Sequence, residues 1–138
     1  YQDLSELLCS RDKTLTLHGD NDTRLILSHI EQAGFGMVEC FVSHPMVETT
    51  LTEARAEWGS RVIIWGGVPS SILEEPYSDA EFEAYMEEIF RTIAPGDAFI
   101  LGVADNVMPG AKLERVQRIT EMVAQYGRYP IDVRGLSA

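Results

Sequence analysis

A strand–loop–helix pattern that recurs four times along the chain constrains its fold more than any other feature. Apolar, β-forming segments begin near residues 14, 37, 62 and 98, and each is followed by a loop and a segment with helical spacing of apolar residues. The segments start about 23, 25 and 36 residues apart, which suits right-handed βα units. We therefore expect an α/β fold with four parallel strands in sequential order.

The boundaries of the elements follow from local signals. Expected strands cover residues 14–18, 37–42, 62–65 and 98–103, and the pair Gly66-Gly67 is expected to break the third. Capping boxes predict that helices begin after Thr50 and Ser78. Apolar residues expected to face inward occur in the helices over 23–33 and 111–126: Leu25, Ile26, Ile30 and Ala33 in the first, and Leu113, Val116, Ile119 and Val123 in the second.

Two architectures accommodate four βα units: a small open doubly wound sheet, or half of an eightfold (β/α) barrel of TIM type. An open sheet would normally add a fifth strand, for which residues 129–131 are a weak candidate. The half barrel agrees with a chain that opens at Tyr1 without an initiator Met or a signal sequence, from which we expect a longer gene product. We therefore predict a half barrel with parallel strands.

Composition excludes several classes of partner. Acidic residues outnumber basic ones by 22 to 11, for a net charge of −11, so the chain is unsuited to nucleic acid or an anionic membrane surface. No apolar run approaches the roughly 20 residues of a membrane-spanning helix. Cys9 and Cys40 match no zinc, redox or disulfide spacing. We expect two buried, reduced thiols in a cytoplasmic protein.

Polar residues gather where the expected strands end, which is where both architectures place function. His18 and Asp20 follow the first strand, Glu39 lies in the second, Trp65 ends the third and Asp105 follows the fourth. The opposite ends of the strands carry ordinary glycine and proline turns. This asymmetry predicts a site at the carboxyl edge of the sheet.

Residue spacing indicates a metal site. His18 and Asp20 are two residues apart, so they point the same way at a strand end. An imidazole nitrogen and a carboxylate oxygen can bind zinc, with Asp105 as a third ligand and one position open for substrate. The alternative is structural: Asp20 caps the next helix and His18 bonds a backbone group.

Glu39, Trp65 and Gly67 are candidates for contact with a substrate. Glu39 lies between apolar neighbours and can act as a general acid, general base or anchor if it faces the barrel, or it faces solvent. Trp65 either walls a pocket or packs in the core, and Gly67 lets a ligand approach the backbone. The Gly66-Gly67 pair matches no phosphate loop.

Three segments resemble the uroporphyrinogen decarboxylase superfamily. They are LHGDN at 17–21, WGGVPSS at 65–71, and FILGVADNV at 99–107 followed by Pro109. The resemblance implies that residues 1–138 are a single domain, the C-terminal half of that family's TIM barrel, and that activity belongs to the full barrel. Within the superfamily the chain is most similar to the corrinoid-dependent methyltransferase branch.

That branch implies methyl transfer between a small molecule and a corrinoid protein, with zinc held by a His-x-Cys pair and a later Cys. The His corresponds to His18, whereas the two Cys positions fall on Asp20 and Asp105. Oxygen ligands make the site harder, which favours a methylated or methoxylated donor with zinc as Lewis acid over activation of a thiol. Glu39 and Asp105 are the expected catalytic residues, and Trp65, Gly67 and Asn106 are expected to bind substrate.

Two other functions stay open at this point: a decarboxylase-type lyase that needs no corrinoid, and a non-catalytic half barrel that binds a small ligand or a partner. The expected partners of the first function are a small methyl donor and a corrinoid protein. A half barrel also leaves two sheet edges unpaired, so we expect either a homodimer or an N-terminal half that completes the barrel.

Overall fold

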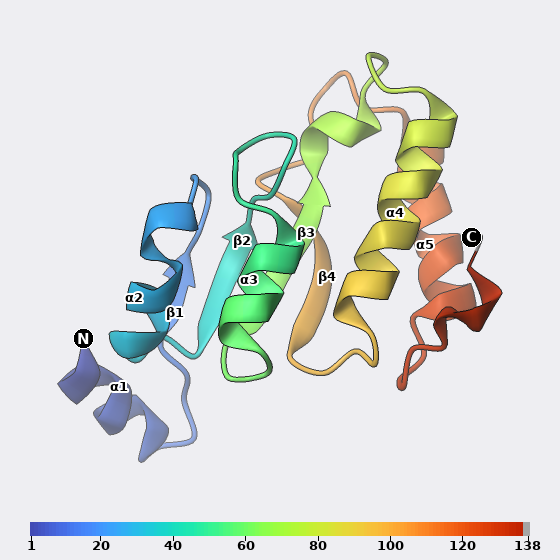
Figure 1. Cartoon of the computed structure of the whole chain (residues 1–138). Coiled ribbons are helices and arrows are strands. Elements are labelled where there is room, and N and C mark those ends of the chain that lie inside the picture. Colours follow the sequence, from blue (N-terminus) through green and yellow to red (C-terminus); the bar gives the residue numbers. More distant parts are fainter. Residues whose placement is uncertain (137–138) are drawn as a thin grey trace.

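One parallel sheet forms the centre of the molecule. The computed structural model describes residues 1–136, and its strands are β1 (Thr16–His18), β2 (Met37–Phe41), β3 (Ile63–Pro69) and β4 (Phe99–Ala104). Every pairing is parallel and the order is β1-β2-β3-β4 (Figure 1). The prediction of four sequential parallel strands is confirmed.

Helices follow each strand and cover one face of the sheet. The helical elements are α1 (Gln2–Cys9), η1 (Arg24–Ile26), α2 (Leu27–Gln32), α3 (Leu51–Trp58), η2 (Ser70–Leu73), α4 (Asp79–Ile93), α5 (Leu113–Tyr126) and η3 (Val133–Gly135). Helices α2, α3 and α4 lie side by side in front of the strands (Figure 1). Both predicted capping boxes, at Thr50 and Ser78, are formed. Within residues 1–136, every helix is too short or too polar to span a bilayer.

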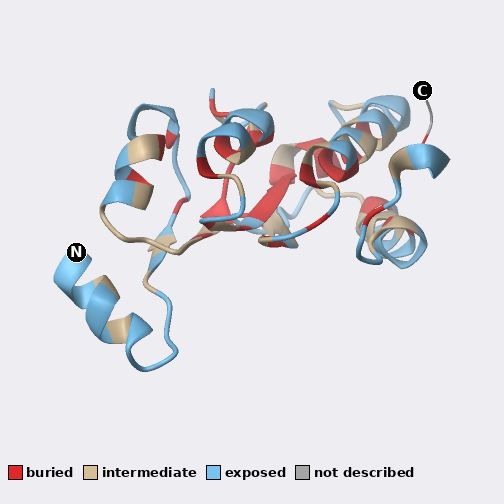
Figure 2. Ribbon diagram, turned by 60° about the horizontal axis from the view of Figure 1, so that its bottom comes forward, coloured by how far each residue is buried: buried red, intermediate tan, exposed pale blue. Residues whose placement is uncertain are grey.

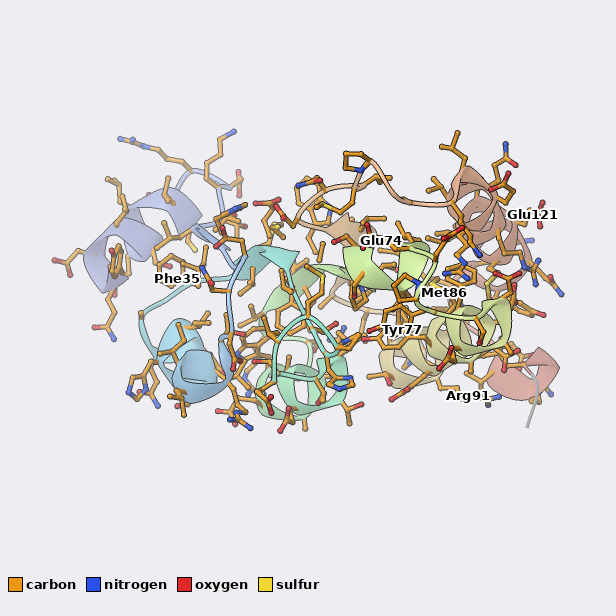
Figure 3. All side chains as sticks on the ribbon, turned by 90° about the horizontal axis from the view of Figure 1, so that it is seen from above. Phe35, Glu74, Tyr77, Met86, Arg91 and Glu121 are labelled. Carbon is orange, nitrogen blue, oxygen red and sulfur yellow. The ribbon has the colours of Figure 1, made fainter. Side chains whose placement is uncertain are left out.

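The core lies between the helices and the sheet. Leu17, Val38, Ile64 and Phe99 form a row across the four strands, each in register with the next. The last three are buried and belong to the main apolar cluster (Figure 2). Seen from above, Met86 of α4 lies within this packed layer, whereas Glu121 of α5 lies at the outer rim (Figure 3).

The opposite face of the sheet is open. His18, Glu39, Trp65 and Ile100 alternate with the core row, and all four are exposed or half-buried. A doubly wound sheet carries helices on both faces and a change of direction in its strand order. This sheet has a strictly sequential order and, on its open face, exposed side chains, as expected for half of a (β/α)8 barrel.

Several local expectations are corrected. Strand β3 does not break at Gly66-Gly67 but stays paired with β4 up to Pro69. Glycine tolerates the φ values of 137° and 86° that the chain adopts at these two positions. Leu25 is 88% exposed and Ile26 is also exposed, since residues 24–26 form a 3₁₀ turn and not the first turn of an α-helix.

The C-terminal segment also differs from expectation. In α5, Arg115 and Met122 are the buried residues, whereas Leu113 and Val123 are exposed. Residues 129–131 form no strand, and the Ile131 amide donates a hydrogen bond to the carbonyl of Pro95. Cys9, at the end of α1, is exposed, and only Cys40 is a buried thiol.

Candidate functional site

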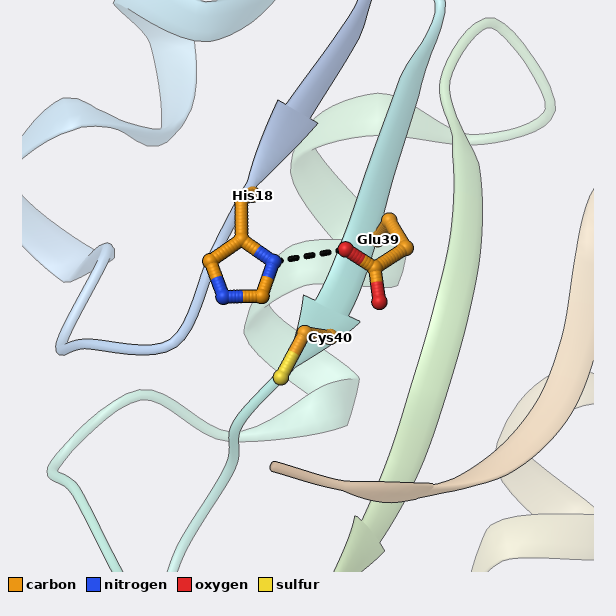
Figure 4. Close-up of side chains that lie close together, drawn as sticks. All are labelled: His18, Glu39 and Cys40. Atoms are coloured by element: carbon orange, nitrogen blue, oxygen red, sulfur yellow. Dashed lines mark hydrogen bonds and ion pairs between the residues drawn. The ribbon is translucent and has the colours of Figure 1, made fainter. Parts of the chain in front are cut away.

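His18 and Glu39 form the centre of the site. They are register partners, His18 at the end of β1 and Glu39 in the middle of β2, and 2.6 Å separates His18 Nδ1 from Glu39 Oε2 (Figure 4). The hydrogen bond to Glu39 raises the pKa of His18, and the negative charges of Glu39, Asp20 and Asp105 add to that rise. These carboxylates therefore stabilise the charged imidazolium relative to an isolated imidazole ring.

A β-bulge in β2 brings a third donor to this pair. Val38 pairs with Ile64 and Phe41 pairs with Gly66, so two residues of β2, Glu39 and Cys40, stand opposite the single residue Trp65. Cys40 takes a left-handed φ of 56°. One ligand atom each from His18, Glu39 and Cys40 all lie within 4.8 Å of one another. In a regular strand, Glu39 and Cys40 would point to opposite faces of the sheet. The bulge brings their side chains to the same side.

Asp20 and Asp105 flank the three donors. Asp20 Oδ2 lies 3.7 Å from His18 Nε2, so these two side chains are neighbours. The backbone N–H of Asp105 donates to Cys40 Sγ at 3.0 Å, which holds the loop after β4 against the bulge in β2. Burial raises the pKa of the Cys40 thiol, this N–H partly offsets the rise, and the nearby carboxylates add to it.

Trp65 continues the site onto the next strand. Its side chain is 43% exposed, and it faces the open side, opposite the bulge. Gly102 leaves room for the indole, because a Cβ at that position would lie 3.3 Å from Trp65 Nε1. The alternative of plain core packing does not hold for Trp65 in the described structure.

The two remaining predicted substrate residues are placed differently. A Cβ on Gly67 would lie 3.0 Å from the ring of Phe99, a core residue, so its missing side chain makes room on the helix side of the sheet. Asn106 is exposed in the loop after β4, next to Asp105. The structure therefore places Asp20 beside His18 and the Asp105 backbone beside Cys40. Among the described residues, however, the mutually close ligand atoms belong to His18, Glu39 and Cys40, and Gly67 lies toward the helix side of the sheet.

Cys40 is the residue that sequence reasoning missed. In a regular strand it would point to the face opposite Glu39, and nothing in the sequence marks a bulge there. The donor set that results fits zinc, which accepts imidazole nitrogen, thiolate sulfur and carboxylate oxygen. Imidazole nitrogen, thiol sulfur and carboxylate oxygen are thus all present at one edge of the sheet, from His18, Cys40, and Glu39 with Asp20 and Asp105.

A separate apolar groove lies beside β4. It has a volume of about 430 Å³ and runs between β4, α5 and the C-terminal segment, with Ile100, Ile119, Val123 and Tyr129 in its lining. No described residue of its lining is a His, Cys, Asp or Glu. The groove therefore has no chemistry of its own.

Comparison with known proteins points to one kind of fold. No protein-family model matches the chain, and no curated protein matches it by sequence. Among solved structures, it is similar to a methyltransferase from Methanosarcina mazei, with a TM-score of 0.64 and 19% identity. The match covers 90% of this chain and 34% of that one. The two share a fold, and this chain spans about a third of the other's length.

Proposed function

We propose that the chain is the C-terminal half of a uroporphyrinogen decarboxylase-like barrel that moves a methyl group from a small methylated or methoxylated donor to a corrinoid protein. The observation that carries the proposal is the His18–Glu39 pair, formed by facing residues of two neighbouring parallel strands. The shared fold with a methyltransferase supports it, as do the three family-like segments.

His18, Asp20 and Asp105 are the residues proposed to hold a zinc ion, with Glu39 beside them. When bound, the ion supplies Lewis acidity, which polarises the bond between the methyl group and its leaving atom. The His18–Glu39 hydrogen bond fixes the imidazole ring, since Nδ1 faces the carboxylate and Nε2 faces Asp20. The Glu39 carboxylate accepts this hydrogen bond and lies beside the proposed ion, where it is proposed to contact the bound donor.

Trp65 is proposed as the wall against which the donor rests. Its exposed indole stands one strand beyond Glu39, and Gly102 leaves the surface beside it open. An aromatic wall excludes water from one side of a bound methyl donor. Asn106, beside Asp105 in the loop after β4, is proposed to contact the polar end of the same molecule.

A corrinoid assay tests this function on the full product of the gene. Purified protein, zinc, reduced cobalamin and candidate methylated or methoxylated donors are mixed, and methylcobalamin is followed by its absorbance. We expect His18→Ala to lower the rate by about 100-fold or more, as loss of a positioned catalytic group does.

The matched control is His29→Ala, which removes an exposed imidazole from α2 and should leave the rate unchanged. Equal rates for the wild-type protein and His18→Ala would contradict the proposal. Release of CO₂ from a carboxylated substrate without a corrinoid would contradict it as well, in favour of a lyase.

A further inference from the structure

The bulge in β2 places a sulfur atom where two expected sulfurs are missing. Asp20 and Asp105 occupy the positions at which the resemblance implies cysteines, so the ligand set expected from the sequence contains only nitrogen and oxygen. Cys40 Sγ nevertheless lies within 4.8 Å of donor atoms of both His18 and Glu39 (Figure 4). A thiol thus reaches the site from a strand position that the family pattern does not use.

The surroundings of Cys40 differ from those of a cysteine that only fills a core. Free cysteines that act as small apolar residues pack among hydrocarbon side chains. Cys40 is 6% exposed, yet its sulfur faces an imidazole and a carboxylate, and it accepts an N–H from Asp105 at 3.0 Å. A donor aimed at the sulfur favours the thiolate over the thiol.

A bound metal would act on the Cys40 sulfur directly, because a thiol that coordinates a divalent cation loses its proton outright. The Asp105 N–H then serves as an outer hydrogen bond that orients the ligand, as such partners do in many metal sites.

We propose that Cys40 binds the same zinc ion as His18, with Glu39 beside it. Its thiolate supplies the sulfur that the expected ligand positions lack. On binding, the S–H bond breaks, a sulfur–zinc bond forms and the proton leaves to solvent. No electron is transferred in this step. The proposal deepens the proposed function by naming a ligand of its metal, but it concerns metal binding alone.

Cobalt substitution tests the sulfur–metal bond directly. Cobalt(II) replaces zinc in such sites and gives a thiolate-to-metal charge-transfer absorption only when sulfur is bound. The chain has two cysteines, so Cys9→Ser is the matched control: Cys9 is exposed on α1. We expect the absorption in the wild-type protein and in Cys9→Ser, and its loss in Cys40→Ser, with zinc affinity lowered at least about tenfold.

A measurement on protein that retains Cys40 guards against misfolding of the variant. The zinc X-ray absorption spectrum of Cys9→Ser should contain one sulfur at about 2.3 Å. A spectrum with nitrogen and oxygen neighbours only, a charge-transfer band that survives in Cys40→Ser, or a wild-type protein that binds no metal would each overturn the proposal.

The outcome is separable from that of the methyl-transfer assay. Methyl transfer by a zinc site without sulfur would refute the ligand role of Cys40 and leave the proposed function standing. A sulfur–zinc bond in a protein that is inactive with every donor would support the ligand role of Cys40 and contradict the proposed function.

Discussion

Arg115 is a cation enclosed by the protein, although α5 was expected to bury an apolar stripe. Its side chain is 4% exposed, and its guanidinium donates to the carbonyls of Ile72, Glu74 and Tyr77 at 2.8, 2.8 and 2.5 Å. It also donates to Asp79 Oδ1 at 2.7 Å. Arg115 therefore holds together η2, the turn labelled by Glu74 and Tyr77 in Figure 3, and the start of α4.

Replacing Arg115 with Met should destabilise the protein. The substitution removes the guanidinium donor from the carbonyls of Ile72, Glu74 and Tyr77, of which the first contact is buried and the other two are part-buried. Loss of these hydrogen bonds should cost about 1–3 kcal/mol. Urea unfolding followed by circular dichroism measures the change. Arg134→Met is the control, because Arg134 is exposed and its ion pair with Asp132 lies at the surface; an equal loss in both variants would show that Arg115 is not special.

The partner of Arg115 predicts how acid affects stability. The hydrogen bond from Arg115 lowers the pKa of Asp79, and the charge of Lys112 lowers it further. A carboxyl group with a lowered folded-state pKa stabilises the fold above its unfolded pKa, and this stabilisation disappears as the pH falls through the lowered value.

Asp79→Asn should accordingly make the free energy of unfolding fall less between neutral pH and pH about 3 than in the wild-type protein. Unfolding curves across this range measure the slope. Glu75→Gln, in the exposed turn before α4, should keep the wild-type slope, and a wild-type slope in Asp79→Asn would refute the linkage.

At the scale of single residues, the sequence predicts the site better than the core of its last helix. His18, Asp20 and Asp105 were found because they lie at or just after strand ends, and the chain direction alone brings strand ends to one edge. Glu39 was found as a carboxylate between apolar neighbours within a strand. Cys40 could not be found, since a one-residue bulge reverses the face on which it lies. Their catalytic and ligand roles stay predictions.

At the scale of the elements, local chemistry predicts where helices begin. The capping boxes at Thr50 and Ser78 join residues only three positions apart. They can therefore be recognised without knowledge of the tertiary structure. Strand β3 was cut short because its two glycines were interpreted as a break. Gly66 lies against the backbone of Phe41 in the bulged strand β2. The sequence gives no sign of this close approach.

Gly66 should be the least replaceable glycine of β3. A Cβ at this position would lie 2.7 Å from the amide nitrogen of Phe41, in the backbone of β2, and the φ of 137° disfavours any side chain. We expect Gly66→Ala to lower the free energy of unfolding by about 1–3 kcal/mol. Gly135→Ala is the control, since its nearest contact would be at 3.6 Å; similar stabilities of the two variants would count against this account of the bulge.

The cap of α4 gives a second prediction for an element. Ser78 Oγ accepts the Glu81 amide at 3.2 Å, and the Glu81 carboxylate accepts the Ser78 amide at 2.7 Å. Ser78→Ala should cost about 1 kcal/mol in thermal or urea unfolding. Ser60→Ala, at an exposed turn, should be neutral, and a neutral Ser78→Ala would mean that packing alone fixes this helix start.

At the scale of the whole molecule, the strand order can be predicted from the sequence because few rules govern how βα units connect. Short connections and right-handed crossovers leave one simple arrangement for four βα units of this size. The inward stripe predicted for α5 is met in part, since Val116 and Ile119 pack against the core whereas Leu113 and Val123 are exposed. Ile119 and Val123 face the groove beside β4, where the next unit of a closed barrel would pack, and the described structure leaves this side uncovered.

The open face of the sheet predicts how the isolated 138-residue chain behaves. Trp65 is 43% exposed and Ile100 is 42% exposed on that face, and strands β1 and β4 have unpaired outer edges. A Trp side chain carries roughly 200 Å² of surface, so covering the exposed part of Trp65 alone stabilises an assembly by about 2 kcal/mol at about 25 cal/mol per Å².

We therefore expect the isolated chain to self-associate at micromolar concentration in sedimentation velocity, with edges β1 and β4 paired between copies. Ile100→Lys places a charge on the open face and should shift the chain toward monomer. Leu25→Lys introduces the same charge at an exposed site on η1, away from that face, and should change nothing. A wild-type chain that sediments as a stable, folded monomer would show that the open face needs no cover, and a full gene product that is monomeric while the isolated chain is not would show that the cover belongs to the same polypeptide.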